Sequence, residues 1–141
     1  MNTELMFNSE KMDWTTPKEF FKQLDDEFHF TLDPASTHEN ALCEKHYTTE
    51  EDGLKQDWEG EIVYCNPPYG REVKYWVKKC YEESLKPNTT VVLLIFARTD
   101  TKYFYDYIYK KAELRFIKGR LKFGNCKNSA PFPSMVVIFR R

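Results

Sequence analysis

The most regular feature of the chain is the alternation of apolar runs with amphipathic segments. Residues 90–97 form one continuous apolar run, which is typical of a strand buried on both faces of a parallel sheet. Shorter apolar runs at 62–65, 113–117 and 135–139 predict three further strands. Strands and helical segments therefore alternate, which predicts an α/β fold with helices on both faces of the sheet.

Three amphipathic segments predict the helices. The first has Thr16 as its N-cap, Pro17 at its first helical position and Glu19 closing a capping box, and it extends to about Phe28. The second covers residues 72–84, where apolar side chains recur on one face. A third helical stripe is formed by Tyr103, Phe104, Tyr107 and Ile108.

The first half of the chain also contains two weaker patterns. Residues 28–32 predict a short strand that leads into a polar turn at 33–36. Residues 37–60 are polar, and here we expect a short helix around 40–43 and a turn at 51–53.

The apolar run at 62–65 stops abruptly at Asn66-Pro67-Pro68-Tyr69. Two prolines fix φ and remove two backbone donors, so this turn is stiff and rich in hydrogen-bond acceptors. The Asn66 side-chain oxygen and the Pro67 carbonyl can orient an amino group, and Tyr69 can stack on a planar substrate. The set suits methylation of an amino nitrogen on a planar group, although a proline-rich turn whose tyrosine covers the core would have the same composition.

Three predicted strands end in polar sequence, at residues 33–36, 66–69 and 98–101. Ligands of α/β sheets bind outside the carboxyl ends of the strands, so one site is expected there. The five glycines include neither a Gly-x-Gly-x-x-Gly nor a phosphate-binding loop, which argues against a standard dinucleotide cradle and against hydrolysis of nucleoside triphosphates.

Composition limits the remaining classes of function. The 141 residues, 41% of them hydrophobic, suffice for one domain with its own core. No apolar stretch approaches a membrane span and the first residues do not resemble a signal peptide, so we expect a cytoplasmic protein without a membrane partner. Four widely spaced cysteines and three histidines show no metal-ligand spacing, so we expect no metal, and reduced, mostly buried thiols.

Charge is distributed unevenly although the net charge is only −1. Residues 1–61 carry 5 Lys/Arg against 16 Asp/Glu, whereas residues 102–141 carry 10 against 2. The basic segment is suited to neutralising phosphates, or it is a solvated surface whose charges are paired across the fold. Its candidate residues are Lys110, Lys111, Arg115, Lys118, Arg120, Lys122 and Lys127.

Short motifs spread over most of the chain resemble those of the phage-type DNA N6-adenine methyltransferases of the Dam family. They are Asp13-Trp14-Thr15-Thr16-Pro17, Leu32-Asp33-Pro34-Ala35-Ser36, Asp52-Gly53-Leu54 with Trp58, Asn66-Pro67-Pro68-Tyr69, Arg98-Thr99-Asp100-Thr101, Gly119-Arg120-Leu121-Lys122-Phe123 and Ala130-Pro131-Phe132-Pro133-Ser134. The resemblance implies the class I S-adenosylmethionine-dependent fold, a compact, mostly parallel sheet flanked by helices with an antiparallel C-terminal strand. It also implies methyl transfer to N6 of adenine in DNA. It departs from methyltransferases at large because the motif at 33–36 replaces a glycine-rich loop.

The resemblance also assigns roles to residues of this chain. The implied catalytic residues are Asn66, Pro67, Pro68 and Tyr69. The implied S-adenosylmethionine contacts are Trp14, Thr16, Pro17, Asp33, Pro34, Ala35, Ser36, Asp52 and Leu54. The implied DNA contacts are Tyr69, Arg98, Arg120, Lys122 and Phe123, with Phe123 holding a flipped base opposite Tyr69.

Several alternatives stay open. The tetrapeptide at 66–69 also suits a methyltransferase acting on RNA adenine or on a glutamine amide, and a DNA-binding protein without turnover would keep the same fold. An enzyme acting on amides would not need the basic C-terminal segment, and a pure binding protein would not need the acceptor-rich turn. We expect no separate target-recognition domain, so sequence specificity would come from short loops and could require a homodimer.

Overall fold

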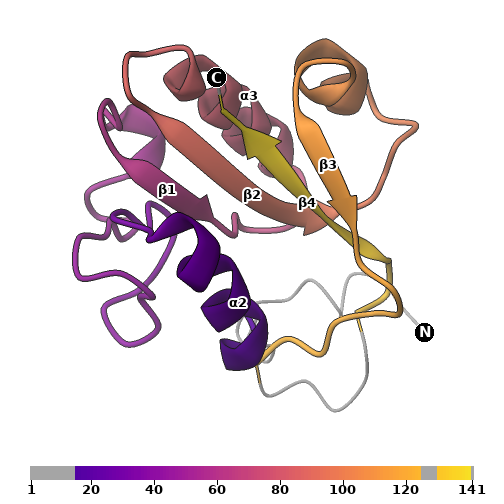
Figure 1. Cartoon of the computed structure of the whole chain (residues 1–141), viewed down its shortest axis with the longest axis horizontal. Helices are drawn as coiled ribbons and strands as arrows, with labels where there is room; N and C mark the ends of the chain where they lie inside the picture. Colours follow the sequence, from indigo (N-terminus) through magenta and orange to yellow (C-terminus); the bar gives the residue numbers. More distant parts are fainter. Residues whose placement is uncertain (1–14, 125–129, 141) are drawn as a thin grey trace.

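The computed structural model describes residues 15–124 and 130–140 as an α/β structure (Figure 1). In chain order its elements are helix α2 (Lys18–Phe28), the 3₁₀ turn η1 (Gly53–Lys55), strand β1 (Ile62–Cys65), helix α3 (Val73–Ser84), strand β2 (Thr90–Phe96), the π-helical turn η2 (Phe104–Ile108), and strands β3 (Glu113–Phe116) and β4 (Ser134–Phe139). All four apolar runs that predicted strands are strands, and the helix predicted at 72–84 is α3. Within the described ranges, no helix is both long enough and apolar enough to cross a membrane.

The strands form one sheet in the order β1-β2-β4-β3. β1 and β2 run parallel, and β4 lies antiparallel between β2 and β3. Hence β1, β2 and β3 share one direction and the C-terminal strand alone is reversed, as predicted. Because β4 separates β2 from β3, most pairings between the named strands are antiparallel, and the sheet is mixed rather than mostly parallel.

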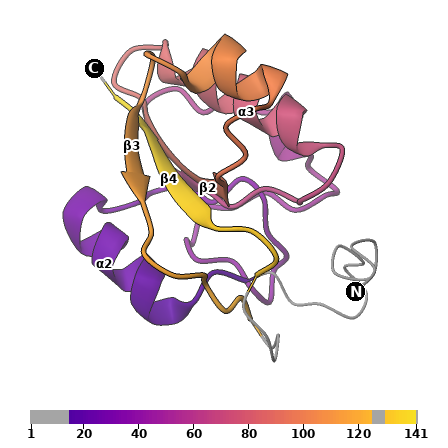
Figure 2. The ribbon, with the colours of Figure 1, turned by 90° about the vertical axis from the view of Figure 1, so that its right-hand side faces the viewer.

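Alternate residues of the central strand face two different cores. Val91 and Leu93 of β2 belong to the core that also contains Trp76 of α3, whereas Val92 and Leu94 belong to the core that contains Leu24 of α2. Figure 2 shows α2 on one face of the sheet and α3 on the other. A strand covered on both faces must be apolar at every position, which explains the uninterrupted run that identified β2.

Helix α2 begins later than predicted, and the predicted capping box is wrong. Pro17 occupies the N-cap position, and the helix start has no side-chain cap. Thr16 cannot cap because its hydroxyl is hydrogen-bonded to Tyr64 and Asn66. The apolar stripe is confirmed, since Leu24 and Phe28 are buried.

The strand predicted at 28–32 is much shorter in the structure. Phe28 remains in α2, and His29 ends the helix in the left-handed conformation with φ of 59°. Only bridges remain: Leu32 pairs in parallel with Val63, and Asp33 pairs in parallel with His46. The apolar residues of this segment therefore pack at the end of a helix as well as beside β1.

The polar segment 37–60 is mostly irregular. The short helix predicted around 40–43 is wrong, because these residues form only turns and bends. Hydrogen bonds of side chains and of the backbone hold this segment, and one of them runs from the Leu42 N–H to Asp33 Oδ2 at 3.1 Å. The turn predicted at 51–53 is confirmed and leads into η1.

The helical stripe at 103–108 is confirmed as a short helical segment that ends in η2. Phe104 and Ile108 are buried, and Tyr103 and Tyr107 pack half-buried against the same core. The thiols of Cys65 and Cys80 are buried and free, and that of Cys43 is half-buried and free.

Candidate active site

The polar segments that follow the strands meet at one edge of the sheet. Because β1, β2 and β3 share a direction, the chain leaves all three at the same edge, where their arrowheads lie in Figure 1. The loop at 33–36 leaves there too, since Leu32 pairs in parallel with β1. We call this the carboxyl edge, and it is where α/β sheets bind ligands.

Asn66 is the first residue after β1, and both ends of its amide are hydrogen-bonded. Its Nδ2 donates to Thr16 Oγ1 at 3.1 Å, and its Oδ1 accepts from the Tyr69 hydroxyl at 2.9 Å. Thr16 Oγ1 also lies 2.7 Å from the hydroxyl of the buried Tyr64. The side-chain oxygen of Asn66 is thus directed along the turn towards Tyr69.

The two prolines of this turn have different surroundings. Pro67 is buried and Pro68 is exposed, so the turn is anchored on one side and open on the other. Gly70 follows the turn with φ of 110°, a conformation that favours glycine, and its carbonyl accepts the Val73 N–H at the start of α3. The turn is therefore held between β1 and α3.

Tyr69 is part of an aromatic cluster at the carboxyl edge. Its ring stacks on Phe96 with centroids 4.3 Å apart, and Phe123 meets it edge-on at 5.8 Å. Burial raises the pKa of Tyr69 well above its ordinary range, so the hydroxyl stays protonated and donates to Asn66. A planar substrate that stacks on Tyr69 in this conformation must use the ring face opposite Phe96.

Phe96 was not identified from the sequence as a site residue. It is the last residue of an apolar run, and in the sequence it is indistinguishable from the core residues that precede it. The signal that could have found it is its position at the carboxyl end of the central strand, next to the candidate Arg98. Phe123 is buried beside Tyr69, and its contact with a flipped base stays a prediction.

The predicted cofactor loop at 33–36 is held by its own first residue. The carboxylate of Asp33 is buried, and it accepts from the Ala35 N–H at 3.3 Å and from the Leu42 N–H at 3.1 Å. Desolvation raises the pKa of Asp33, against the effect of these two bonds. Ser36 Oγ is buried and has no hydrogen-bond partner within the described ranges.

The predicted motif at 52–54 packs directly on this loop. A Cβ added to Gly53 would lie 2.1 Å from the Pro34 carbonyl oxygen, so only glycine allows the contact. Asp52 has φ of 59°, and its Oδ1 accepts from the Leu54 N–H at 3.1 Å. The structure thus brings the two cofactor motifs together.

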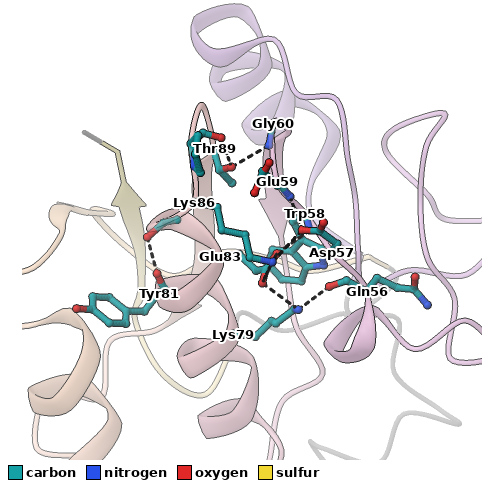
Figure 3. Close-up of polar contacts among 12 residues, drawn as sticks. Gln56, Asp57, Trp58, Glu59, Gly60, Lys79, Tyr81, Glu83, Lys86 and Thr89 are labelled. Atoms are coloured by element: carbon teal, nitrogen blue, oxygen red, sulfur yellow. Dashed lines mark hydrogen bonds and ion pairs between the residues drawn. The ribbon is translucent and has the colours of Figure 1, made fainter.

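A buried polar cluster supports these loops from α3 (Figure 3). The Trp58 indole N–H donates to the Gly53 carbonyl at 3.0 Å, and the Trp58 backbone N–H donates to Glu83 Oε1 at 2.6 Å. Lys79 and Lys86 form ion pairs with the same carboxylate, at 3.2 and 2.8 Å. We call Trp58, Lys79, Glu83 and Lys86 the Glu83 cluster.

The predicted DNA contacts also lie at the carboxyl edge. Arg98 follows β2 and lies over the Phe132 ring at 5.1 Å, and Arg120 donates to the Pro131 carbonyl at 2.9 Å. Lys118 and Lys122 follow β3 and are exposed. The loop that contains them reaches the start of α2, because the Gly124 N–H donates to the Thr15 carbonyl at 2.9 Å.

The other basic residues of the C-terminal segment lie elsewhere. Lys110 and Lys111 precede β3 and are therefore at the opposite edge of the sheet. Arg115 forms a bidentate pair with Glu27, both contacts at 2.7 Å, and a further pair with Glu113. Arg115 is thus part of a paired surface, the alternative that the sequence left open.

Two predicted residues lie outside the described ranges, namely Trp14 and Lys127. Pro17 is half-buried at the start of α2, where its carbonyl accepts the Phe21 N–H. Among the residues that the structure describes, no group of three or more His, Cys, Asp or Glu side chains is arranged to hold a metal ion.

Comparison with known proteins identifies the family of this chain. A family model described as DNA N-6-adenine-methyltransferase (Dam) matches residues 4–141. A DNA N-6-adenine-methyltransferase of Escherichia phage T1 is 34% identical over 110 residues, which cover 77% of this chain and 45% of that protein. One of Haemophilus phage HP1 (strain HP1c1) is 29% identical over 143 residues, which cover 94% of this chain and 82% of that protein.

The chain therefore spans less than half of the phage T1 relative and most of the HP1 relative. The family match covers nearly the whole chain and includes every motif from Asp13 to Ser134 that carried the resemblance. The chain belongs to the Dam family of DNA N-6-adenine-methyltransferases.

Proposed function

We propose that this chain transfers a methyl group from S-adenosylmethionine to the N6 amino nitrogen of adenine in DNA. The observation that carries the proposal is the Asn66 amide at the end of β1, with its oxygen directed towards an aromatic cluster of Tyr69, Phe96 and Phe123. An oriented acceptor beside aromatic rings is what a planar base with an amino group requires. The two phage relatives carry the same activity in their names.

The residues of the turn orient the acceptor nitrogen. An adenine amino group is a weak nucleophile because its lone pair is delocalised into the ring. Hydrogen bonds from this group to Asn66 Oδ1 and to the Pro67 carbonyl would localise that lone pair and aim it at the methyl carbon. Positioning of this kind supplies a large part of a rate enhancement without a covalent enzyme intermediate.

Tyr69 has two roles in this proposal. Its ring supports the base, and its hydroxyl donates to Asn66 Oδ1 at 2.9 Å. An amide oxygen has two lone pairs, so the amino group of the base either shares this oxygen with Tyr69 or takes its place. In double-stranded DNA the base must leave the helix to reach the turn, and this cost is lowest where the base is already single-stranded.

The loops at 33–36 and 52–54 fit a polar cofactor. The buried Ser36 hydroxyl lacks a partner within the described ranges, a situation that costs about 1–3 kcal/mol and that a polar ligand would relieve. The close packing of Gly53 on Pro34 joins the loop at 52–54 to the loop at 33–36. When bound, S-adenosylmethionine supplies a methyl group on a sulfonium sulfur, and the proton of the amino nitrogen leaves after transfer.

The arrangement of the sheet supports assignment to the class I methyltransferase fold, because only the C-terminal strand is reversed. The exposed Lys118 and Lys122, together with Arg98, provide positive charge at the carboxyl edge for a phosphate backbone. A glutamine amide would not need this charge.

The proposal is tested by incubating the purified chain with cofactor labelled in its methyl group and with DNA, RNA or protein. Mass spectrometry should find N6-methyladenine in DNA, and the Asn66→Ala variant should be the negative control. Label in RNA adenine or in glutamine would replace the proposed substrate. The absence of cofactor binding in calorimetry, with and without DNA, would overturn the proposal that the chain is an enzyme.

A further inference from the structure

A chain of hydrogen bonds connects the interior of the protein to Asn66. Tyr64 in β1 is fully buried, and its hydroxyl lies 2.7 Å from Thr16 Oγ1. Thr16 is 2% exposed, and its Oγ1 accepts from Asn66 Nδ2 at 3.1 Å. The two contacts join residues 48 and 50 positions apart, so they tie the segment before α2 to the end of β1.

The direction of these bonds determines which end of the Asn66 amide faces the substrate. A threonine hydroxyl has one proton and two lone pairs, so alone it would accept either orientation of an amide. If its proton is given to the Tyr64 oxygen, only lone pairs remain for Asn66. The amide must then present its NH₂ group to Thr16 and its oxygen to the turn.

The Tyr64 side chain is well placed to receive this proton. Its ring packs against Phe21 of α2 at 5.1 Å and against Phe30 at 5.2 Å, which holds the hydroxyl in place. Burial raises the pKa of Tyr64, so its hydroxyl stays protonated, and the geometry allows either hydroxyl to be the donor of this bond. The anchor is therefore a rigid part of the core.

We propose that Thr16, with Tyr64 behind it, is a positioning residue that keeps the Asn66 oxygen facing the target amino group. This inference rests on the proposed role of Asn66 in methyl transfer. It differs from the role that the family resemblance implied for Thr16, which was contact with the cofactor. A flipped amide would present its NH₂ group to the amino group of adenine, and two donors repel each other.

The test compares three variants with the wild type at saturating cofactor. Thr16→Val keeps the shape of the side chain and removes the hydroxyl, Thr16→Ser keeps the hydroxyl, and Tyr64→Phe removes only the phenol oxygen. We expect Thr16→Val and Tyr64→Phe to lower kcat by about 10- to 100-fold, by analogy with loss of the groups that orient metal ligands. Thr16→Ser should restore most of the rate, and the Kd of the cofactor should stay within about twofold of wild type in all three.

A matched control comes from the opposite edge of the sheet. Thr89 precedes β2 and is also buried, and its hydroxyl accepts the Gly60 N–H at 2.8 Å (Figure 3). Thr89→Val should lower the melting temperature without changing kcat, which separates loss of stability from loss of orientation. If Thr16→Val does not fold, Tyr64→Phe still measures the loss of the same contact, with Thr16→Ser as the variant that keeps it.

The outcomes distinguish this inference from the proposed function. An Asn66→Ala variant with full activity would refute the proposed function itself. An inactive Asn66→Ala variant together with wild-type kcat in Thr16→Val and Tyr64→Phe would overturn only the positioning role. A Thr16→Val variant with weaker cofactor binding and unchanged kcat at saturation would overturn it as well, because Thr16 would then be a cofactor contact.

Discussion

At the scale of single residues, the proposed methyl transfer depends on the side-chain oxygen of Asn66. Asn66→Ala removes the acceptor that Tyr69 contacts at 2.9 Å, and it should cut the methyl-transfer rate by about 100-fold or more, as loss of one oriented polar group does in other preorganised sites. Fold and cofactor affinity should change little. Asn66→Asp keeps an acceptor and should retain some activity. Single-turnover rates and cofactor calorimetry measure both effects.

Tyr69 should respond differently, because its ring and hydroxyl have separate contacts. Tyr69→Ala loses the ring that stacks on Phe96, which should weaken productive base binding by about 1–3 kcal/mol. Tyr69→Phe keeps this ring and loses only the bond to Asn66, so its effect should be milder. Comparison of KM for DNA decides the point, and equal damage in the two variants would make the hydroxyl bond the important contact.

At the scale of elements, helix α3 supports the predicted cofactor motif at 52–54 through the Glu83 cluster, which Figure 3 shows. Glu83→Ala would leave the Trp58 N–H without its acceptor and would remove the ion pair of the partly buried Lys79, which would keep its bond to the Gln56 carbonyl. Removing one partner of a buried ion pair costs about 3–5 kcal/mol, so we expect a large drop in the free energy of unfolding. Glu83→Gln keeps an acceptor for Trp58 and should cost less, and the exposed neighbour Glu82→Ala is the control. Urea denaturation measures all three.

The same cluster predicts how these variants depend on pH. Burial alone would raise the pKa of Glu83, but bonds from Lys86, the Trp58 N–H and Lys79 outweigh it, and the pKa is lowered below 4.5. A lowered carboxylate pKa stabilises the folded state above the unfolded pKa, and this stability is lost as pH falls through the folded pKa. The stability difference between wild type and Glu83→Gln should therefore shrink as pH falls below about 4.5. A stability difference that does not change with pH would show that the charge of Glu83 contributes nothing to the free energy of unfolding.

At the scale of the whole molecule, the sheet direction divides the basic residues into two groups. Lys118 and Lys122 follow β3 at the carboxyl edge, whereas Lys110 and Lys111 precede it. Changing Lys118 and Lys122 together to Gln should weaken DNA binding and reduce the slope of log affinity against log salt by about 2 for B-DNA, or about 0.9 per lost phosphate contact. Changing Lys110 and Lys111 to Gln is the matched control and should alter the slope much less. Equal effects of the two pairs would place DNA elsewhere.

Charge also explains why the acidic N-terminal half does not prevent this arrangement. Arg115, which counted as basic in the sequence, is paired with Glu27 of α2 and with Glu113. Glu113 also pairs with Arg140. These pairs neutralise the surface between α2 and the β3 side of the sheet, and they leave the loop after β3 as the basic region next to the site.

Much of the fold follows from local pattern. The β2 run, the stripe of α3 and the stripe that ends in η2 could be identified because strands buried on both faces and amphipathic helices impose a period on the sequence. The prediction of a strand at 28–32 was wrong because an apolar residue such as Phe28 packs equally well at the end of a helix and in a strand. The prediction of a helix at 40–43 was wrong because a tertiary contact holds this segment: the buried carboxylate of Asp33, nine residues earlier in the chain, accepts the Leu42 N–H.

The sequence by itself determined the order of the strands and helices, the stiff turn at 66–69 and the family, because these depend on neighbouring residues and on motifs at known spacing. Tertiary structure alone decided which partners those residues have. Thr16 binds Asn66 and does not cap α2 as expected, and Phe96 stacks on the ring of Tyr69. The physical reason is that hydrogen bonds and ring contacts require closeness in space, and the shared direction of β1, β2 and β3 brings distant segments together at one edge.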